Sequence, residues 1–124
     1  ITADPIVWLN GQLLEKPKSE EDACNMLREL SGNTHQVFTA VCMRSAYESQ
    51  SFVCVSEVDF ANLTDEQICY YVTKYKPLDK AGSYGIQEWI GFVGIKGIRG
   101  SYYNVMGLPV QRLFTALQTL KVTK

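Results

Sequence analysis

The sequence predicts a single α/β domain in which helices flank a curved, mixed β-sheet. Two observations support this prediction. Segments with the apolar patterns of strands alternate with segments that have the 3.6-residue period of helices, and short turns join neighbouring strands. The 124 residues contain 46% apolar side chains, which is enough for one hydrophobic core. No linker, repeat or low-complexity segment divides residues 1–124, so we expect one domain.

A β-hairpin and a helix are expected first. The dipeptide Asn10-Gly11 suits the two positive φ angles of a type I′ turn, which predicts a hairpin between residues 6–9 and 12–14. Ser19 suits the N-cap of a helix over residues 20–30, since an acidic side chain follows three positions later. The apolar stripe of this helix consists of Ala23, Leu27 and Leu30.

Two strands and a second helix follow. Residues 35–43 and 52–60 have the apolar character of strands and are joined by a polar turn. Their first half is expected to be buried on both faces because of Phe38, Val41, Phe52, Val53 and Val55. Thr64 and Gln67 form the capping box of the next helix, whose apolar positions fall at i, i+3, i+4 and i+7 from Ile68.

The last third is expected to contain an irregular stretch, a strand, a loop and a helix. Residues 78–91 are rich in glycine, residues 92–98 have the pattern of a strand, and residues 100–108 are expected to form a loop. Pro109 suits the start of a final helix, where its missing N–H is not needed. The predicted core face of this helix consists of Val110, Leu113, Phe114, Leu117 and Leu120.

Composition excludes several classes of protein. The net charge is −1 and the basic residues are scattered, so no surface for nucleic acid or for a membrane is expected. No apolar run reaches the roughly 18 residues of a transmembrane helix. The four cysteines and the single histidine lack the spacing of a zinc site. We expect free thiols in a reducing compartment, which predicts a cytoplasmic protein.

Two polar residues near the ends of predicted elements could bind phosphate or metal. Asp4 directly precedes an apolar strand, where a carboxylate can hold Mg²⁺ or Mn²⁺ or orient a water, although Asp before proline is more often a turn residue. Lys16 lies just before a helix N-terminus, where the lysine and the free N–H groups would both favour an anion. The alternative is a solvated lysine.

The glycine-rich loop offers a second set of candidates. Its glycines allow the backbone to approach a ligand closely, and Gln87 can donate and accept hydrogen bonds, as the edge of a nucleobase requires. Lys80 could face the same ligand, or it could form a surface ion pair with Asp79. His35 is expected to be structural. The residues that could line a pocket or pack beneath the last helix are Tyr102, Tyr103 and Asn104.

Several motifs occur in a characteristic order along the chain. They are Ala3-Asp4, Glu15-Lys16-Pro17, Thr34-His35-Gln36-Val37, the run PLDKAGSYGIQ from Pro77 to Gln87, and the run GSYYNVMGLP from Gly100 to Pro109. Together they resemble the Maf (septum-formation) family of nucleoside triphosphate pyrophosphatases. The resemblance extends from Ala3 to about Leu113, and the two long runs are its most specific parts.

The resemblance implies hydrolysis of a nucleoside triphosphate to the monophosphate and pyrophosphate, with a divalent metal, Mg²⁺ or Mn²⁺. It places the catalytic and metal-binding carboxylate on Asp4, a phosphate-facing lysine on Lys16 and the base-reading glutamine on Gln87. Lys80 is expected to bind the substrate as well. Gln87 resembles the branch of the family that acts on dTTP and UTP, because the branch acting on 7-methyl-GTP usually lacks this glutamine.

Two departures from the family pattern affect these expectations. Pro5 stands where the family has threonine, which removes a backbone donor and a hydroxyl beside Asp4. The family's Ser-x-Ser-Pro-Arg-Arg phosphate loop has no counterpart, so we expect a C-terminal portion of such an enzyme with low activity. The alternatives are an impaired nucleotide-binding or oligomerising fragment and a structural domain without a ligand. Uncovered apolar surface near residues 1–9 predicts a homo-oligomer.

Overall fold

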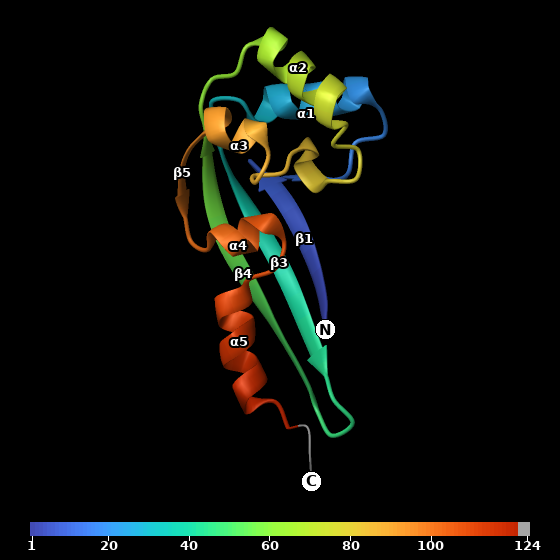
Figure 1. The fold of residues 1–124 in the computed structure, drawn as a ribbon, viewed down its shortest axis with the longest axis vertical. Helices are drawn as coiled ribbons and strands as arrows, with labels where there is room; N and C mark the ends of the chain where they lie inside the picture. Colours follow the sequence, from blue (N-terminus) through green and yellow to red (C-terminus); the bar gives the residue numbers. More distant parts are fainter. Residues whose placement is uncertain (122–124) are drawn as a thin grey trace.

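The structure is a computed structural model that describes residues 1–121. Its sheet has the strand order β2-β1-β3-β4-β5 and is flanked by helices (Figure 1), which confirms the predicted α/β class. The strands are β1 (Thr2–Leu9), β2 (Gln12–Leu14), β3 (Thr34–Arg44), β4 (Ser49–Phe60) and β5 (Ile95–Arg99). The helices are α1 (Glu20–Leu30), α2 (Asp65–Tyr75), the 3₁₀ turn η1 (Ala81–Ser83), α3 (Trp89–Gly94), α4 (Tyr102–Met106) and α5 (Val110–Thr119).

Each of the four strand pairs formed by residues 1–121 is antiparallel, so the parallel pairs that a mixed sheet would contain do not occur there. β3 and β4 pair along their whole length, from Thr34 opposite Asp59 to Arg44 opposite Ser49. They form a long ribbon, with α1, α2 and α3 gathered at one end and α4 and α5 along the rest (Figure 1). None of the helices in the described part has both the length and the apolar character needed to cross a membrane.

The local signals at the hairpin and at the helix starts are confirmed. Asn10 and Gly11 have φ angles of 50° and 80° and connect Leu9 to its partner Gln12. Ser19 Oγ accepts a hydrogen bond from the third residue of α1 at 3.0 Å. Both bonds of the predicted capping box are present at the start of α2. These elements agree with prediction because residues close in sequence determine them.

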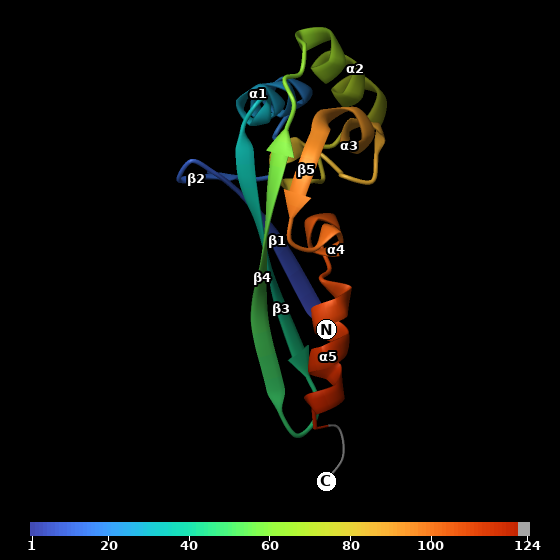
Figure 2. The same ribbon diagram turned by 90° about the vertical axis from the view of Figure 1, so that its left-hand side faces the viewer.

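One face of the sheet carries the hydrophobic core. In β3 the odd-numbered residues from His35 to Met43 are buried, as the alternation of a strand requires. The main cluster lies under α1, α2 and α3 and includes Leu27, Phe60 and Tyr71. A smaller cluster of Val41, Met43 and Leu113 lies under α5. The helical layer therefore covers this face along the length of the ribbon, as Figure 2 shows for α3, α4 and α5.

The opposite face of the sheet is open, and the prediction of burial on both faces is wrong there. Val53 and Val55 are 51% and 48% exposed. In the strand register, Ile6, Phe38 and Val55 stand side by side, and both Ile6 and Trp8 are exposed. The apolar residues indicated strands correctly, but no helix among residues 1–121 packs on this side to bury them.

The last third differs most from the sequence prediction. Residues 92–94 belong to α3 and not to a strand, since a short apolar run suits either structure. The expected loop contains α4, which Ser101 caps and Gly107 ends with a φ of 117°. Of the predicted core face of α5, only Leu113 is buried, while Phe114 is 64% exposed. A single helix lying on two strands can bury only a narrow stripe.

The stability of the fold is expected to fall at acid pH through Asp59. Hydrogen bonds from Arg99, and then from Thr34, lower the pKa of this carboxyl to about 2 from its ordinary 3.8. A depressed folded-state pKa stabilises the fold above pH 3.8, and this contribution is lost as the pH falls toward 2. Urea midpoints between pH 6 and pH 2.5 should therefore drop more for the wild type than for Asp59→Asn. The control Glu29→Gln, at an exposed carboxylate on α1, should show the same drop as the wild type. An equal drop in the urea midpoint in all three proteins would contradict this prediction.

Candidate functional site

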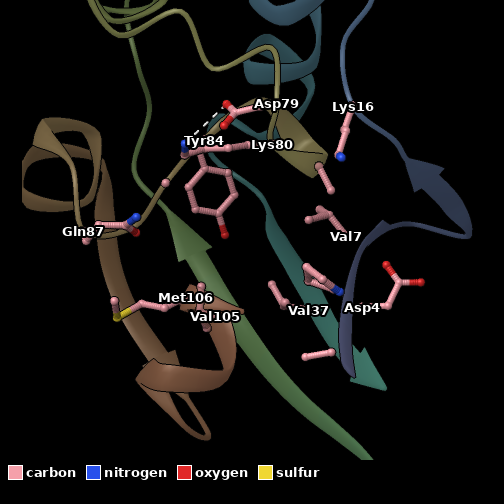
Figure 3. Close-up of a pocket in the computed structure, with 14 residues that line it drawn as sticks. Asp4, Val7, Lys16, Val37, Asp79, Lys80, Tyr84, Gln87, Val105 and Met106 are labelled. Carbon is pink, nitrogen blue, oxygen red and sulfur yellow. Dashed lines mark hydrogen bonds and ion pairs between the residues drawn. The ribbon is translucent and has the colours of Figure 1, made fainter. Parts of the chain in front are cut away.

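A pocket of about 440 Å³ opens between β1, the segment before α1, the glycine-rich loop and α4 (Figure 3). Its polar lining consists of Asp4, Lys16, Asp79, Lys80, Tyr84 and Gln87. Its apolar lining includes Val7, Val37, Val105 and Met106. The four predicted site residues therefore border one pocket, although up to 83 positions separate them in the sequence.

The glycine-rich loop is docked against β1 through Gly82. This residue has a φ of 73°, and a Cβ on it would lie 3.1 Å from Cγ1 of Val7. Its N–H donates to the carbonyl oxygen of Glu15 at 3.2 Å. Because Glu15 directly precedes Lys16, this one contact brings the segments of Lys16 and Lys80 to the same pocket. A larger residue at position 82 would push the loop away from β1.

A buried tyrosine fixes the other end of the loop. Tyr71 of α2 donates a hydrogen bond from Oη to Oε1 of Glu88 at 2.5 Å and accepts one from the N–H of Gly85 at 3.0 Å. Burial, and then the bond to Glu88, raises the pKa of Tyr71, so its phenol stays protonated. The loop that carries Lys80 and Gln87 is thus tied to α2 by charge-assisted hydrogen bonding.

Tyr84 of the loop stands over a buried histidine. His35 Nε2 lies 2.6 Å from Tyr84 Oη, and the imidazole ring stacks on Phe60 with ring centroids 5.5 Å apart. Burial lowers the pKa of His35 to about 4, against a smaller opposing effect of the Asp59 carboxylate, so the ring is neutral at pH 7. These contacts place His35 in the core, as its expected structural role requires.

Asp4 borders the pocket, but its side chain points away from the centre. Along β1, Val7 and Leu9 are buried on the helical face, so Asp4 shares the opposite face with Ile6 and Trp8. Figure 3 shows its carboxylate on the far side of β1 from Gln87. β2 pairs only with Val7–Leu9, so the edge of β1 beside Asp4 is unpaired within the described residues. The carboxylate is exposed there.

Lys80 was expected either to face the ligand or to form a surface ion pair with Asp79, and the structure contains the ion pair. Its Nζ lies 3.4 Å from Oδ1 of Asp79, whose side chain is 78% exposed. Such a pair contributes little to stability. Its Cε would lie 2.9 Å from a Cβ on Gly85, which shows how closely the lysine crosses the loop backbone. Lys80 therefore stays beside the pocket, and a phosphate could replace Asp79 as its partner.

Sequence reasoning missed the importance of Asn104. Its side chain is fully buried, and Nδ2 donates to the carbonyl oxygen of Val37 at 3.2 Å and to Oγ of Ser56 at 3.0 Å. Tyr102 and Tyr103, which were expected to line a pocket or to pack beneath the last helix, are 41% and 54% exposed. The Ser101-x-x-Asn104 spacing could have indicated the helix cap, but nothing local indicates the contacts with β3 and β4. Asn104 anchors α4, which lines the pocket.

The residues of the pocket suit a metal ion that the substrate itself helps to hold. Within residues 1–121, no group of three or more Asp, Glu, His or Cys side chains is placed to bind a metal. Two exposed carboxylates border the pocket. Asp79 is paired with Lys80, and Asp4 has no ion-pair partner within the described residues. Mg²⁺ typically binds one or two carboxylates together with substrate phosphates and waters. The donor set therefore fits this kind of site and not an all-protein metal site.

Comparisons with known proteins establish the family. A family model described as "Maf-like protein" matches residues 1–120. The chain belongs to the Maf family. This confirms the resemblance seen in the motifs.

Several curated relatives of this Maf chain carry the name "dTTP/UTP pyrophosphatase". The protein from Phocaeicola vulgatus is 62% identical over 120 residues, and that from Bacteroides thetaiotaomicron is 56% identical over 120 residues. The protein from Porphyromonas gingivalis W83 is 55% identical over 118 residues. These matches cover 97%, 97% and 95% of this chain but only 62%, 62% and 59% of the relatives. The Maf chain described here thus spans about three fifths of their length.

Proposed function

We propose that the pocket binds a pyrimidine nucleoside triphosphate, dTTP or UTP, and hydrolyses it to the monophosphate and pyrophosphate. The observation that carries this proposal is the meeting of Lys16, Lys80 and Gln87, from separate segments, in one pocket. Relatives up to 62% identical are named for this activity. Two cations suit the phosphates, and one amide beside them suits the base.

The roles of the side chains follow from their chemistry. Lys16 and Lys80 would stabilise the charge on the phosphates as water attacks the α-phosphorus and pyrophosphate leaves. Gln87 would hydrogen-bond the edge of the pyrimidine, because its amide can both donate and accept. The loop contacts of Gly82 and Tyr71 hold these groups in place before the substrate arrives.

Asp4 is proposed as the catalytic carboxylate and as a ligand of Mg²⁺ or Mn²⁺. A divalent ion, when bound, neutralises charge on the phosphates. Asp4 would hold this ion or accept the proton of the attacking water. To do so, its exposed side chain must reach around the unpaired edge of β1 to the pocket. Pro5 leaves this segment without one backbone donor.

A comparison of Gln87→Ala with Lys16→Ala tests the proposed function. Gln87→Ala should lower kcat/KM for dTTP and UTP by about 1–3 kcal/mol, because the base loses its hydrogen bond. It should narrow the preference for pyrimidines over purines, whereas Lys16→Ala should weaken all triphosphates alike. The measurement is pyrophosphate release from dTTP, UTP, CTP and 7-methyl-GTP, with Gln111→Ala on exposed α5 as the control. If Gln87→Ala slowed every nucleotide equally, Gln87 would only shape the loop.

The orientation of Asp4 favours a second candidate function, in which the domain binds the nucleotide but does not hydrolyse it. The carboxylate points away from the pocket, while both lysines and Gln87 border it. Titration calorimetry with dTTP, run beside the pyrophosphate assay, separates the two functions. Binding without pyrophosphate release would support this candidate, and release at rates typical of enzymes, about 1 s⁻¹ or more, would exclude it.

We also propose that two copies of the chain associate through the open face of the sheet. Ile6, Trp8, Val53 and Val55 are exposed on this face, and the edge of β1 before Val7 is unpaired within the described residues. Such surfaces tend to be covered. Sedimentation velocity should show a dimer that Val53→Lys dissociates; a monomer at high concentration would contradict this proposal.

The four free cysteines support a cytoplasmic location, which fractionation of cells would test.

A further inference from the structure

The buried pair of His35 and Tyr84 leaves one proton without a partner. His35 Nε2 lies 2.6 Å from Tyr84 Oη, and Nδ1 of His35 has no hydrogen-bond partner within the described residues. If Nδ1 carried the ring proton, a buried N–H donor would be unsatisfied, which native proteins rarely tolerate. With the proton on Nε2, His35 donates to Tyr84. The donor left unpaired within the protein is then the Tyr84 hydroxyl, which borders the pocket and can meet an acceptor there, so this tautomer is favoured.

This tautomer leaves the hydroxyl proton of Tyr84 free to be donated elsewhere. Burial raises the pKa of Tyr84, so the hydroxyl keeps its proton. In the described part of the chain, His35 is the one hydrogen-bond partner of this hydroxyl. Figure 3 shows the ring pointing its hydroxyl toward Val37 and Val105, two residues that border the pocket. Neither side chain can accept the proton, so an acceptor has to come from the pocket.

The position of Tyr84 suggests which part of a nucleotide supplies that acceptor. In Figure 3 its ring stands between the amide of Gln87 and the ammonium of Lys16, and all three residues border the same pocket. If Gln87 meets the base and Lys16 meets the phosphates, the part of the ligand above Tyr84 is the sugar that joins them. The hydroxyl of a deoxyribose or ribose is a suitable acceptor there.

We propose that Tyr84 donates a hydrogen bond to the 3′-oxygen of the bound nucleotide, and that His35 is a positioning residue that orients the Tyr84 hydroxyl for it. The inference rests on the proposed function, since it requires a nucleotide in this pocket. It adds selection for the sugar to selection for the base by Gln87. It also gives the buried histidine a role in recognition beyond packing against Phe60.

Removal of the 3′-hydroxyl from the ligand tests the proposal. Dissociation constants of dTTP and of its 3′-deoxy analogue would be measured by titration calorimetry with EDTA present, so that neither is hydrolysed. The wild type should bind dTTP about 3- to 10-fold more tightly than the analogue, as one neutral hydrogen bond allows. Tyr84→Phe, which keeps the ring and removes the hydroxyl, should bind both nucleotides about equally. The control Tyr103→Phe, at an exposed tyrosine, should keep the wild-type ratio.

Two variants of His35 separate positioning from packing. His35→Gln keeps an N–H donor near the place of Nε2 and should retain part of the preference for dTTP, whereas His35→Leu should lose it. The ratio of two dissociation constants on one variant does not depend on how much of that variant is folded. Equal binding of the two nucleotides by the wild type, or an unchanged preference in Tyr84→Phe, would overturn the inference and leave the proposed function intact. Failure of the wild type to bind either nucleotide in EDTA, and to bind or hydrolyse dTTP with Mg²⁺, would overturn both.

Discussion

Replacing Asp4 with asparagine is expected to lower kcat for dTTP by about 10²- to 10⁴-fold. An amide cannot accept a proton from water at neutral pH and binds a divalent cation poorly, so both proposed roles of Asp4 would be lost. The fold should not change, because the side chain is exposed and makes no hydrogen bond within the described residues. Pyrophosphate release gives kcat, and a urea unfolding curve shows that stability is kept.

Asp79→Asn is the matched control for Asp4→Asn. Asp79 also borders the pocket, but its proposed part is limited to a surface ion pair with Lys80. Its replacement should therefore change kcat much less than the replacement of Asp4. Unchanged turnover in Asp4→Asn would mean that Asp4 is only an edge residue of β1. The catalytic carboxylate would then have to be sought elsewhere, with Asp79 as the remaining acidic residue at the pocket.

Replacing Asn104 with alanine is expected to lower the free energy of unfolding by about 2–3 kcal/mol. The change removes a donor that serves the Val37 carbonyl and the Ser56 hydroxyl, and it leaves a small void in a fully buried position. The gain from removing the unpaired Oδ1 of Asn104 offsets only part of this loss. Urea unfolding at pH 7, followed by circular dichroism, measures the effect.

Asn62→Ala controls for the loss of an asparagine side chain as such. Asn62 is exposed, and its replacement should change the free energy of unfolding by less than about 0.5 kcal/mol. If Asn104→Ala were no more damaging than this control, the buried hydrogen bonds of α4 would contribute little. The packing of its apolar side chains would then have to hold α4 on the sheet.

The parts of the fold that the sequence predicted are those that residues close together in the chain determine. The turn at Asn10-Gly11 and the caps at Ser19 and Thr64 depend on contacts within three or four residues. The exposure of Val55 and Phe114 depends on which elements pack above them. Apolar side chains indicate that a strand or helix forms, but they do not show that a partner covers it.

In the candidate site, too, the sequence predicted which residues take part but not the contacts that depend on distant elements. The motifs identified Lys16, Lys80 and Gln87, and the structure brings them to one pocket. The direction of the Asp4 side chain could not be predicted, because it depends on which face of β1 the helices cover. The buried bonds of Tyr71 and Asn104 were also missed, since their partners lie between 14 and 67 positions away.

The bond between Tyr71 and the backbone of Gly85 has a consequence for motion. Tyr71 belongs to the main core, so the Gly85 amide cannot reach solvent while α2 remains packed. This part of the loop therefore cannot move independently of α2 to close over a ligand. Its opening is coupled to the loosening of the helical layer, so the deuterium exchange of the Gly85 amide reports on that larger cooperative unit and not on a local fluctuation. A nucleotide that contacts this loop would then stabilise α2 as well.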